Sequence, residues 1–359
     1  MLGISFTNCT EDTEDQFGPN PEEEAKQQFS YVLNEGAQGA NNANISGFVA
    51  TLKDNVADKE LKALGDLYYK ENQKQMGDVA NAIVMEDENI YVVMYDSKYI
   101  GKLDLKCKEE ARYTFPQGEG KPRCIDVGND YVYVTQDGGQ VSKINVTDMT
   151  LVNTIQIGDN LEGIVEKDGK LYVANAYKRI YDFNDEVFVI DAKTMTLEKT
   201  LKVALNPTDI YEIHDKIYIL SKGDYTNVPA VLQVFEPSTG TVKQIPQTEN
   251  IEKLTGGDNK LIYGVRSIKD ENWIPTNSFF TCTAKADEVS ETSFLKDVPA
   301  ALKNANIYFI EMDEDNGYIY IGTTDYTTNG QIYQFDSNGN FIQSFDSGGI
   351  NPKAMIFID

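Results

Sequence analysis

Few residues in this chain are suited to catalysis. The 359 residues include one histidine, His214, in a segment that is typical of a turn between two strands. A metal centre built on several histidines is therefore excluded, and a serine–histidine–aspartate triad would depend on this residue alone. Residues 313–317 match the start of a calcium loop, but the downstream glutamate is absent and a hairpin turn explains them. The sequence predicts no catalytic residue, no metal site and no bound cofactor.

The four cysteines lack the tight, even spacing of a disulfide framework. Cys107, Cys124 and Cys282 lie in or beside predicted strands, so we expect small buried side chains. Cys9 differs, because an apolar segment precedes it and acidic residues follow it. This pattern resembles lipoproteins exported to the outer face of the Bacteroidetes outer membrane, whose cysteine carries the lipid. It predicts a signal remnant, a lipidation site and a flexible acidic tether over residues 1–28; an incidental cysteine is the alternative.

A larger group of side chains suits binding rather than reaction. Aromatic rings, amides and two arginines fall in or beside predicted loops, and rings with polar neighbours suit a large planar ligand with polar edges. The alternative is that tyrosine and asparagine serve as turn residues or pack beneath the loops. The predicted ligand-binding residues are Asn81, Tyr95, Tyr99, Arg123, Asn175, Tyr177, Tyr225, Arg266, Trp273 and Tyr326.

These loops belong to a unit that recurs with a period in the forties, which is typical of propellers and solenoids. Each unit contains an apolar strand, a tight turn, a second strand, a loop and a third strand. An aromatic residue in the second strand counts seven units. The counting residues are Tyr31, Tyr91, Tyr133, Tyr172, Tyr218, Tyr263 and Tyr320.

The first unit lacks an opening strand, and residues 351–358 have the pattern of one. We therefore predict an all-β, seven-bladed β-propeller over residues 29–359, closed when the C-terminal strand joins the first blade. A pair of β-sandwiches is the alternative, against which the regular count argues. Two further expectations are a short helix over residues 57–64, ended by Gly65, and loops between second and third strands over residues 175–183 and 266–277. Because strand direction alternates, the longer loops should share one face and the tight hairpins the other.

The composition limits the partners. The formal charge of −25 argues against nucleic acid, which requires a basic surface, and fits a solvated, repulsive surface. No apolar run reaches the length of a membrane-spanning helix, so an N-terminal lipid would be the only membrane attachment.

Several segments resemble the YncE-like (YVTN-repeat) propellers of Bacteroides surface lipoproteins, and within them the BtuG-type cobalamin-binding proteins. The matching segments are residues 32–36, 41–43, 64–66, 122–123, 162–163, 171–175 and 206–207. The resemblance implies a lipid-anchored protein on the cell surface that captures a corrinoid on one propeller face. It would then pass the corrinoid to a TonB-dependent outer-membrane transporter. The resemblance implies that Cys9 is the lipid site and that the loop face is the binding region, but it assigns no individual corrin contact.

Other functions remain open. A different nutrient could be the ligand, and a protein-interaction platform needs only a surface. A propeller enzyme, such as a quinoprotein dehydrogenase or a lactonase, needs bases or metal ligands converging on the channel. The single histidine, at a turn on the opposite face, and the single tryptophan, Trp273, argue against an enzyme.

Overall fold

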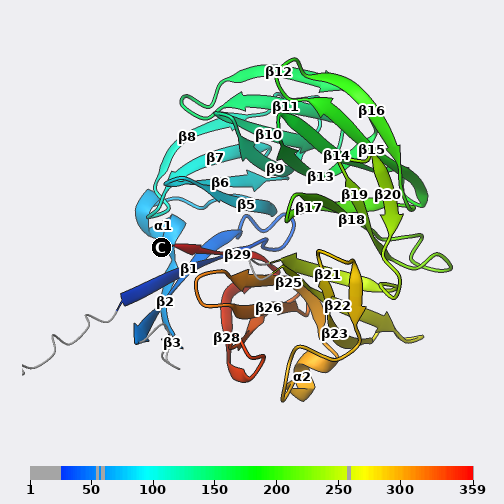
Figure 1. Cartoon of the computed structure of the whole chain (residues 1–359). Helices are drawn as coiled ribbons and strands as arrows, with labels where there is room; N and C mark the ends of the chain where they lie inside the picture. Colours follow the sequence, from blue (N-terminus) through cyan, green and yellow to red (C-terminus); the bar gives the residue numbers. More distant parts are fainter. Residues whose placement is uncertain (1–25, 54–55, 58–60, 257–259, 359) are drawn as a thin grey trace, which may run out of the picture.

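The chain forms seven antiparallel sheets that follow one another around a common axis, as the blades of a propeller (Figure 1). This computed structural model describes residues 26–53, 56–57, 61–256 and 260–358. Blade 1 contains β29 and β1 to β4, and blades 2 to 7 each contain four consecutive strands from β5 to β28. The predicted all-β, seven-bladed fold is confirmed.

The innermost strands are β29 (Pro352–Ile358), β5 (Ala80–Glu86), β9 (Pro122–Gly128), β13 (Asn160–Lys167), β17 (Pro207–Ile213), β21 (Ile251–Gly256) and β25 (Asn306–Asp313). Six of the seven neighbouring pairs of innermost strands pack closely around the axis, and the seventh pair, β17 and β21, meets through side chains such as Asp209 and Lys253.

The second strands are almost continuously apolar because both of their faces are covered. They are β1 (Lys26–Asn34), β6 (Asn89–Met94), β10 (Tyr131–Gln136), β14 (Lys170–Arg179), β18 (Lys216–Ser221), β22 (Leu261–Lys269) and β26 (Tyr318–Thr324). Each carries one of the seven counting tyrosines, all of them buried in the core between blades.

The third strands are β2 (Asn44–Lys53), β7 (Tyr99–Asp104), β11 (Gln140–Asn145), β15 (Asp182–Asp191), β19 (Val231–Glu236), β23 (Pro275–Thr283) and β27 (Asn329–Phe335). The outer edges are β3 (Val56–Ala57), β4 (Lys62–Asp66), β8 (Glu109–Thr114), β12 (Leu151–Gln156), β16 (Thr196–Lys202), β20 (Thr241–Gln244), β24 (Glu288–Ser290) and β28 (Phe341–Ile350). Two short helices, α1 (Leu67–Asn72) and α2 (Ala300–Lys303), complete the fold.

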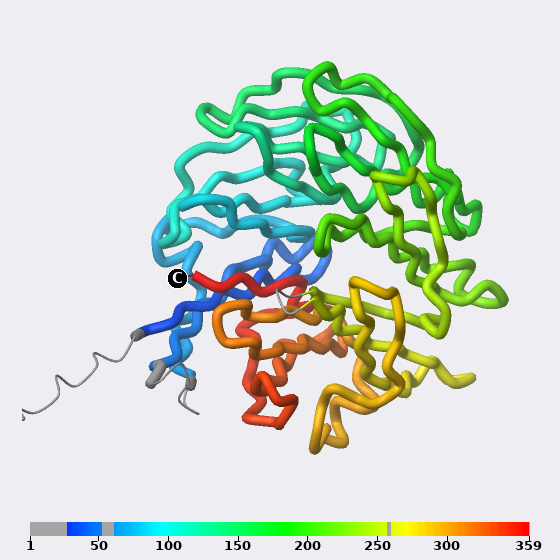
Figure 2. Tube along the Cα trace, in the orientation of Figure 1, coloured from blue at the N-terminus to red at the C-terminus, as the bar shows by residue number. Residues whose placement is uncertain are grey.

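The C-terminal strand closes the ring, as predicted. β29 pairs antiparallel with β1, with Phe29 opposite Ile358 and Tyr31 opposite Ile356. Figure 2 shows the red end of the chain running beside its blue beginning. Met355 of β29 packs with Phe309 and other apolar residues of blades 1 and 7. The innermost strand of blade 1 therefore comes from the far end of the sequence.

Three sequence expectations need correction or qualification. The helix predicted over residues 57–64 is wrong: Lys62–Asp66 forms β4, which pairs with β2 as the outer strand of blade 1, and α1 begins only at Leu67. Pairing with the sheet outweighs helix propensity there. β1 begins at Lys26, three residues before the expected start of the propeller. Cys9 and most of the predicted tether lie outside the described residues.

The third correction concerns two predicted loops. Residues 266–277 are mostly strand, because β22 and β23 stay paired from Leu261 opposite Thr283 to Lys269 opposite Pro275. β14 and β15 likewise continue to a tip at Ile180 and Tyr181. These are the longest second-to-third-strand hairpins beside that of blade 1, and their tips face the candidate site described next.

Candidate functional site

The propeller axis opens on the loop face into a cavity of about 510 Å³, here called the axial mouth. It is lined by residues from the start of the innermost strands and from longer loops, including Asn206 and Lys222. Loops between blades and loops between second and third strands therefore do meet on one face. A second cavity, of about 540 Å³, lies on the hairpin side and includes His214 at the β17–β18 turn. Tyr211, Leu254 and Glu311 border both cavities.

The same irregularity occurs in all seven innermost strands, just after each strand begins. The pairing register with the second strand breaks there, so that one or two residues are left out of the ladder. Such bulges redirect a side chain and occur often beside functional sites. The residues at the breaks, here called the bulge ring, are Asn81, Arg123, Glu162, Thr208, Glu252, Tyr308 and Lys353. Six of them line the axial mouth, and Glu252 lines an adjoining groove.

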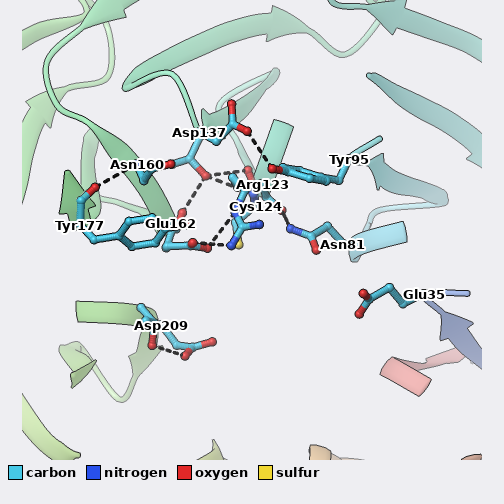
Figure 3. Close-up of polar contacts among 12 residues, drawn as sticks. Glu35, Asn81, Tyr95, Arg123, Cys124, Asp137, Asn160, Glu162, Tyr177 and Asp209 are labelled. Atoms are coloured by element: carbon cyan, nitrogen blue, oxygen red, sulfur yellow. Dashed lines mark hydrogen bonds and ion pairs between the residues drawn. The ribbon is translucent and has the colours of Figure 1, made fainter. Parts of the chain in front are cut away.

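Charges around the mouth are arranged in four pairs. The Arg123 guanidinium binds the Glu162 carboxylate through two nitrogens, with Nε 3.0 Å from Oε2 (Figure 3). The other pairs join Lys222 to Glu252 at 3.3 Å, Lys253 to Asp209 at 3.7 Å and Lys353 to Glu35 at 3.9 Å. Four cations thus face four carboxylates, so the mouth is nearly neutral although the protein is strongly acidic.

Burial and pairing set the ionisation of these groups. Burial raises the pKa of Glu162, and the Arg123 guanidinium opposes that rise. Burial would also raise the pKa of Asp209, but the ammonium groups of Lys253 and Lys222 lower it overall. Asp209 in turn raises the pKa of Lys253. These pairs hold charge in place in a partly buried site.

Glu311 behaves differently, at the constriction between the two cavities. Burial raises its pKa to about 8, although Lys253 and a hydrogen bond from Thr255 act in the opposite direction. At neutral pH this carboxyl is therefore mostly protonated, and it does not upset the charge balance of the mouth.

An apolar cavity of about 460 Å³, here called the aromatic slot, adjoins the mouth. Its walls include the tips of the two long hairpins, with Tyr181 on one and Trp273 on the other. Phe183 contacts both Tyr181 and Tyr225 edge to face, with ring centroids 6.5 and 5.7 Å apart. Tyr177 and Tyr225 line both the slot and the mouth, so the two cavities are continuous.

The structure gathers about half of the predicted ligand-binding residues into these cavities. Asn81, Arg123, Tyr177 and Tyr225 line the mouth, and Trp273 lines the slot. Tyr326 lies at the rim, where its ring contacts the ring of Tyr308 edge to face at 6.2 Å. Whether any of these residues binds a ligand stays a prediction.

The other four predicted residues line neither the mouth nor the slot. Tyr99 is buried in the core and donates to the Met76 carbonyl. Asn175 is buried and accepts from the Asp159 amide at 3.2 Å. Arg266 pairs with Glu291 and lies over the Phe280 ring. Tyr95 stands behind Arg123 and donates to Asp137 at 2.8 Å. Each has its polar group satisfied inside the protein, away from both cavities.

Sequence reasoning also missed several residues of the mouth. One signal was available: each bulge residue directly follows an apolar residue that is the first or second residue of an innermost strand, as Arg123 follows Pro122 and Lys353 follows Pro352. Aligning the units on that position would have shown a column of polar residues. Lys222, Lys253 and Asp209 carry no such mark, since they reach the mouth from a loop or from one position further along a strand.

Two absences, of a metal cluster and of a membrane-spanning helix, concern the described residues only. Among the described residues, no three histidine, cysteine, aspartate or glutamate side chains are placed to hold a metal ion. In the same part of the chain, no helix has the length and apolar character needed to cross a membrane. Cys107 and Cys282 are buried thiols, as expected, whereas Cys124 is half-buried and lines the mouth.

Comparison with known proteins gives the fold. No family model matches the chain, and no curated protein matches it. The WD40 domain of Neurospora crassa Pan2 is 15% identical, with a TM-score of 0.52 over 73% of this chain and 78% of that one. U3-55K is 10% identical, with a TM-score of 0.54 over 74% and 81%. The computationally designed protein Ika8 is 12% identical, with a TM-score of 0.55 over 92% and 90%. Similarity at this level places the chain among β-propellers.

Proposed function

We propose that this protein captures a corrinoid on its loop face and passes it to a TonB-dependent outer-membrane transporter. The observation that carries the proposal is the continuous site formed by a charge-balanced polar mouth and an aromatic slot. A corrinoid has amide edges that need hydrogen-bonding partners and broad apolar faces that need rings or aliphatic surface. The resemblance to YncE-like lipoproteins of the BtuG type supports the same choice.

The balance of charge at the mouth argues for a ligand with little net charge. Each cation there already shares a carboxylate, so an anionic ligand would have to displace a partner and face the remaining acidic surface. A strongly anionic ferric siderophore is disfavoured on these grounds. An uncharged ligand with many amides can accept and donate hydrogen bonds without breaking a pair.

Calorimetric titration with cyanocobalamin tests the proposal, with the visible spectrum followed in parallel. We expect saturable binding of one corrinoid per protein, and no comparable binding of heme or of an anionic ferric siderophore. Tyr225→Ala and Trp273→Ala should each weaken binding by about 1–3 kcal/mol without unfolding the ring. Tyr69→Ala is the matched control, because Tyr69 is an exposed tyrosine on α1 that lines neither cavity.

A second candidate, a protein-interaction platform, is favoured by one observation. Ile180 and Tyr181, at the tip of the β14–β15 hairpin, are 77% and 80% exposed. Exposed apolar groups of this kind often mark contact surfaces. If cyanocobalamin, heme and siderophores all fail to bind, corrinoid capture is refuted and this reading takes its place.

The lipid anchor needs its own test, because it rests on the resemblance and on Cys9. Cys9→Ser should abolish incorporation of a fatty-acid probe and release the protein from the membrane fraction of the producing cell. An unchanged distribution would contradict the anchor while leaving ligand capture open to the titration.

A further inference from the structure

The aromatic slot is separated from the axis, and this separation gives the site two compartments. The mouth is polar and centred on the innermost strands, whereas the slot lies outward over blades 4, 5 and 6. Trp273 is 65% exposed and Tyr225 is 55% exposed, so two large rings of the slot face solvent. Apolar rings that line a cavity in this way indicate a place for a ligand group.

The shape of the slot favours a flat group. Tyr181, Phe183 and Tyr225 form a chain of edge-to-face contacts, and Trp273 closes the side toward blade 6. Aromatic rings prefer offset or edge-to-face partners at centroid distances of about 4.5–7 Å. The volume of about 460 Å³ leaves room for a fused two-ring system between these walls.

A buried donor next to the slot has no acceptor. The Asn206 side chain lines the mouth and is 1% exposed, yet its Nδ2 has no hydrogen-bond partner among the described residues. The Tyr225 hydroxyl lies close enough for Asn206 to oppose the burial-driven rise in the pKa of Tyr225, but it does not complete a hydrogen bond with Nδ2. Leaving a buried donor unpaired is unfavourable, and a ligand oxygen that accepts from Nδ2 would remove this cost.

We propose that the aromatic slot is a second subsite, which takes a planar aromatic group carried by the ligand seated at the mouth, while Asn206 donates to an oxygen of the same ligand. The inference rests on the proposed function. In a corrinoid, the planar group is the aromatic base at the end of the nucleotide arm. The site therefore distinguishes complete corrinoids from those that lack the base.

The test compares two ligands, cyanocobalamin and dicyanocobinamide, which keeps the corrin ring but has no nucleotide base. We expect the wild-type protein to bind cyanocobalamin at least tenfold more tightly. Trp273→Ala and Tyr181→Ala should remove most of that preference, because the loss falls on the ligand that fills the slot. Asn206→Asp, which preserves side-chain size but removes the donor, should weaken cyanocobalamin binding about tenfold.

Tyr326→Ala is the matched control. Tyr326 and Tyr225 are equally exposed, at 55%, but Tyr326 stands beside Tyr308 and does not line the slot. Its loss should leave the ratio of the two affinities unchanged. Thermal melting of every variant checks that the propeller remains folded.

The outcomes separate the two proposals. If neither corrinoid binds, corrinoid capture fails and the subsite fails with it. If both bind equally well, and Trp273→Ala affects them equally, capture stands and the subsite is overturned. A preference for cyanocobalamin that disappears in the slot variants and persists in Tyr326→Ala supports the subsite.

Discussion

The ion pair between Arg123 and Glu162 shows how single residues hold the mouth in shape. Its side chains are 24% and 11% exposed, so both charges are largely removed from water. Asn81 donates to the Arg123 carbonyl at 2.9 Å, and Thr135 donates to the Glu162 carbonyl at 2.6 Å. Blades 2, 3 and 4 are therefore joined at the bulge ring through both side chains and backbone.

Removing one partner of this pair should be costly. Arg123→Met leaves the Glu162 carboxylate without its cation, and we expect the free energy of unfolding at pH 8 to fall by about 2–4 kcal/mol. The loss should be smaller at pH 5, because the unpaired carboxyl can take up a proton. Urea denaturation at both pH values measures it. The double variant Arg123→Met/Glu162→Gln should recover much of the stability; a double variant as unstable as the single one would contradict this account.

Glu311 predicts a pH dependence of stability. Its pKa is raised to about 8 in the folded protein from an ordinary value of 4.5, so the folded state holds a proton that the unfolded state has lost between these values. The stabilising contribution of the protonated group is complete below about pH 4.5 and is lost as the pH rises through 8. Glu311→Gln should match the wild type near pH 4 and exceed its unfolding free energy by roughly 3–5 kcal/mol at pH 9.

Denaturation curves at pH 4 and pH 9 measure this difference. Glu314→Gln provides the control, since Glu314 lines the same cavity but is exposed. It should change stability by less than about 0.5 kcal/mol at either pH. An equal gain for Glu311→Gln at both pH values would show that the proton is not the cause.

At the scale of single residues, the sequence predicted only part of the site. Trp273 and Tyr225 were predicted because aromatic rings with polar neighbours in loops suit a large planar ligand. Tyr99 has the same local pattern, yet its ring belongs to the core of blades 1 and 2. Lys253 and Asp209 lie within strands, and only the three-dimensional ring brings them to the mouth. Which way a side chain points depends on the register break in the innermost strand, a position that only an alignment of the seven units would have shown.

The innermost strands form the next level of organisation, and their close approach depends on glycine. A Cβ on Gly163 of β13 would lie 2.8 Å from the Ile210 nitrogen and 2.9 Å from the Thr208 oxygen. Both atoms are backbone of β17 and cannot rotate away. The absence of a side chain at Gly163 thus lets blades 4 and 5 meet beside the bulge ring.

Gly163→Ala should push β13 and β17 apart. We expect a loss of about 1–3 kcal/mol in unfolding free energy, the usual cost of overpacking, together with weaker ligand binding, since Asp209 lies in the displaced segment. Gly169→Asn is the control: this glycine has φ of +76°, which asparagine tolerates, and nothing within 4 Å of its Cβ position. Its cost should stay below about 1 kcal/mol. Equal losses in the two variants would rule out the steric explanation.

The sequence predicted the type of most elements correctly, but it did not predict where several strands end. The seven-fold recurrence of short apolar strands identified every blade, because blade strands are buried on both faces. The β22–β23 and β14–β15 hairpins were taken for loops, since their outer halves are polar and exposed, and only the cross-strand pairing shows that they are strands. The segment before Gly65 was predicted to be a helix from its local pattern. Pairing with β2, which the local pattern does not show, makes Lys62–Asp66 a strand.

For the whole molecule, closure is the property on which the mouth depends. The sequence predicted it from the likeness of residues 351–358 to the opening strands of other units, and β29 does fill that place. The net charge of −25 was equally visible, but the neutrality of the mouth was not. Charge balance at one site depends on which residues the ring brings together.

Deleting residues 351–359 should open the ring. The inner edge of β1 would lose its partner, and Val32 and Leu33, now fully buried, would be exposed beside it. An unpaired apolar edge favours association with other chains, so we expect oligomers or aggregates in size-exclusion chromatography with light scattering. A peptide of residues 350–359 added in trans should restore the monomer, and a scrambled peptide should not. A monomeric truncated chain with unchanged thermal stability would contradict this.

The pairing of β29 with β1 also fixes when the protein can be finished. Domains usually fold from the N-terminus as the ribosome releases them. Here β1 pairs with β29, which is made much later, so a chain that has not yet reached β29 has an incomplete first blade. Until β29 is made, the inner edge of β1 is unpaired and can associate with other chains, and the axial mouth is incomplete.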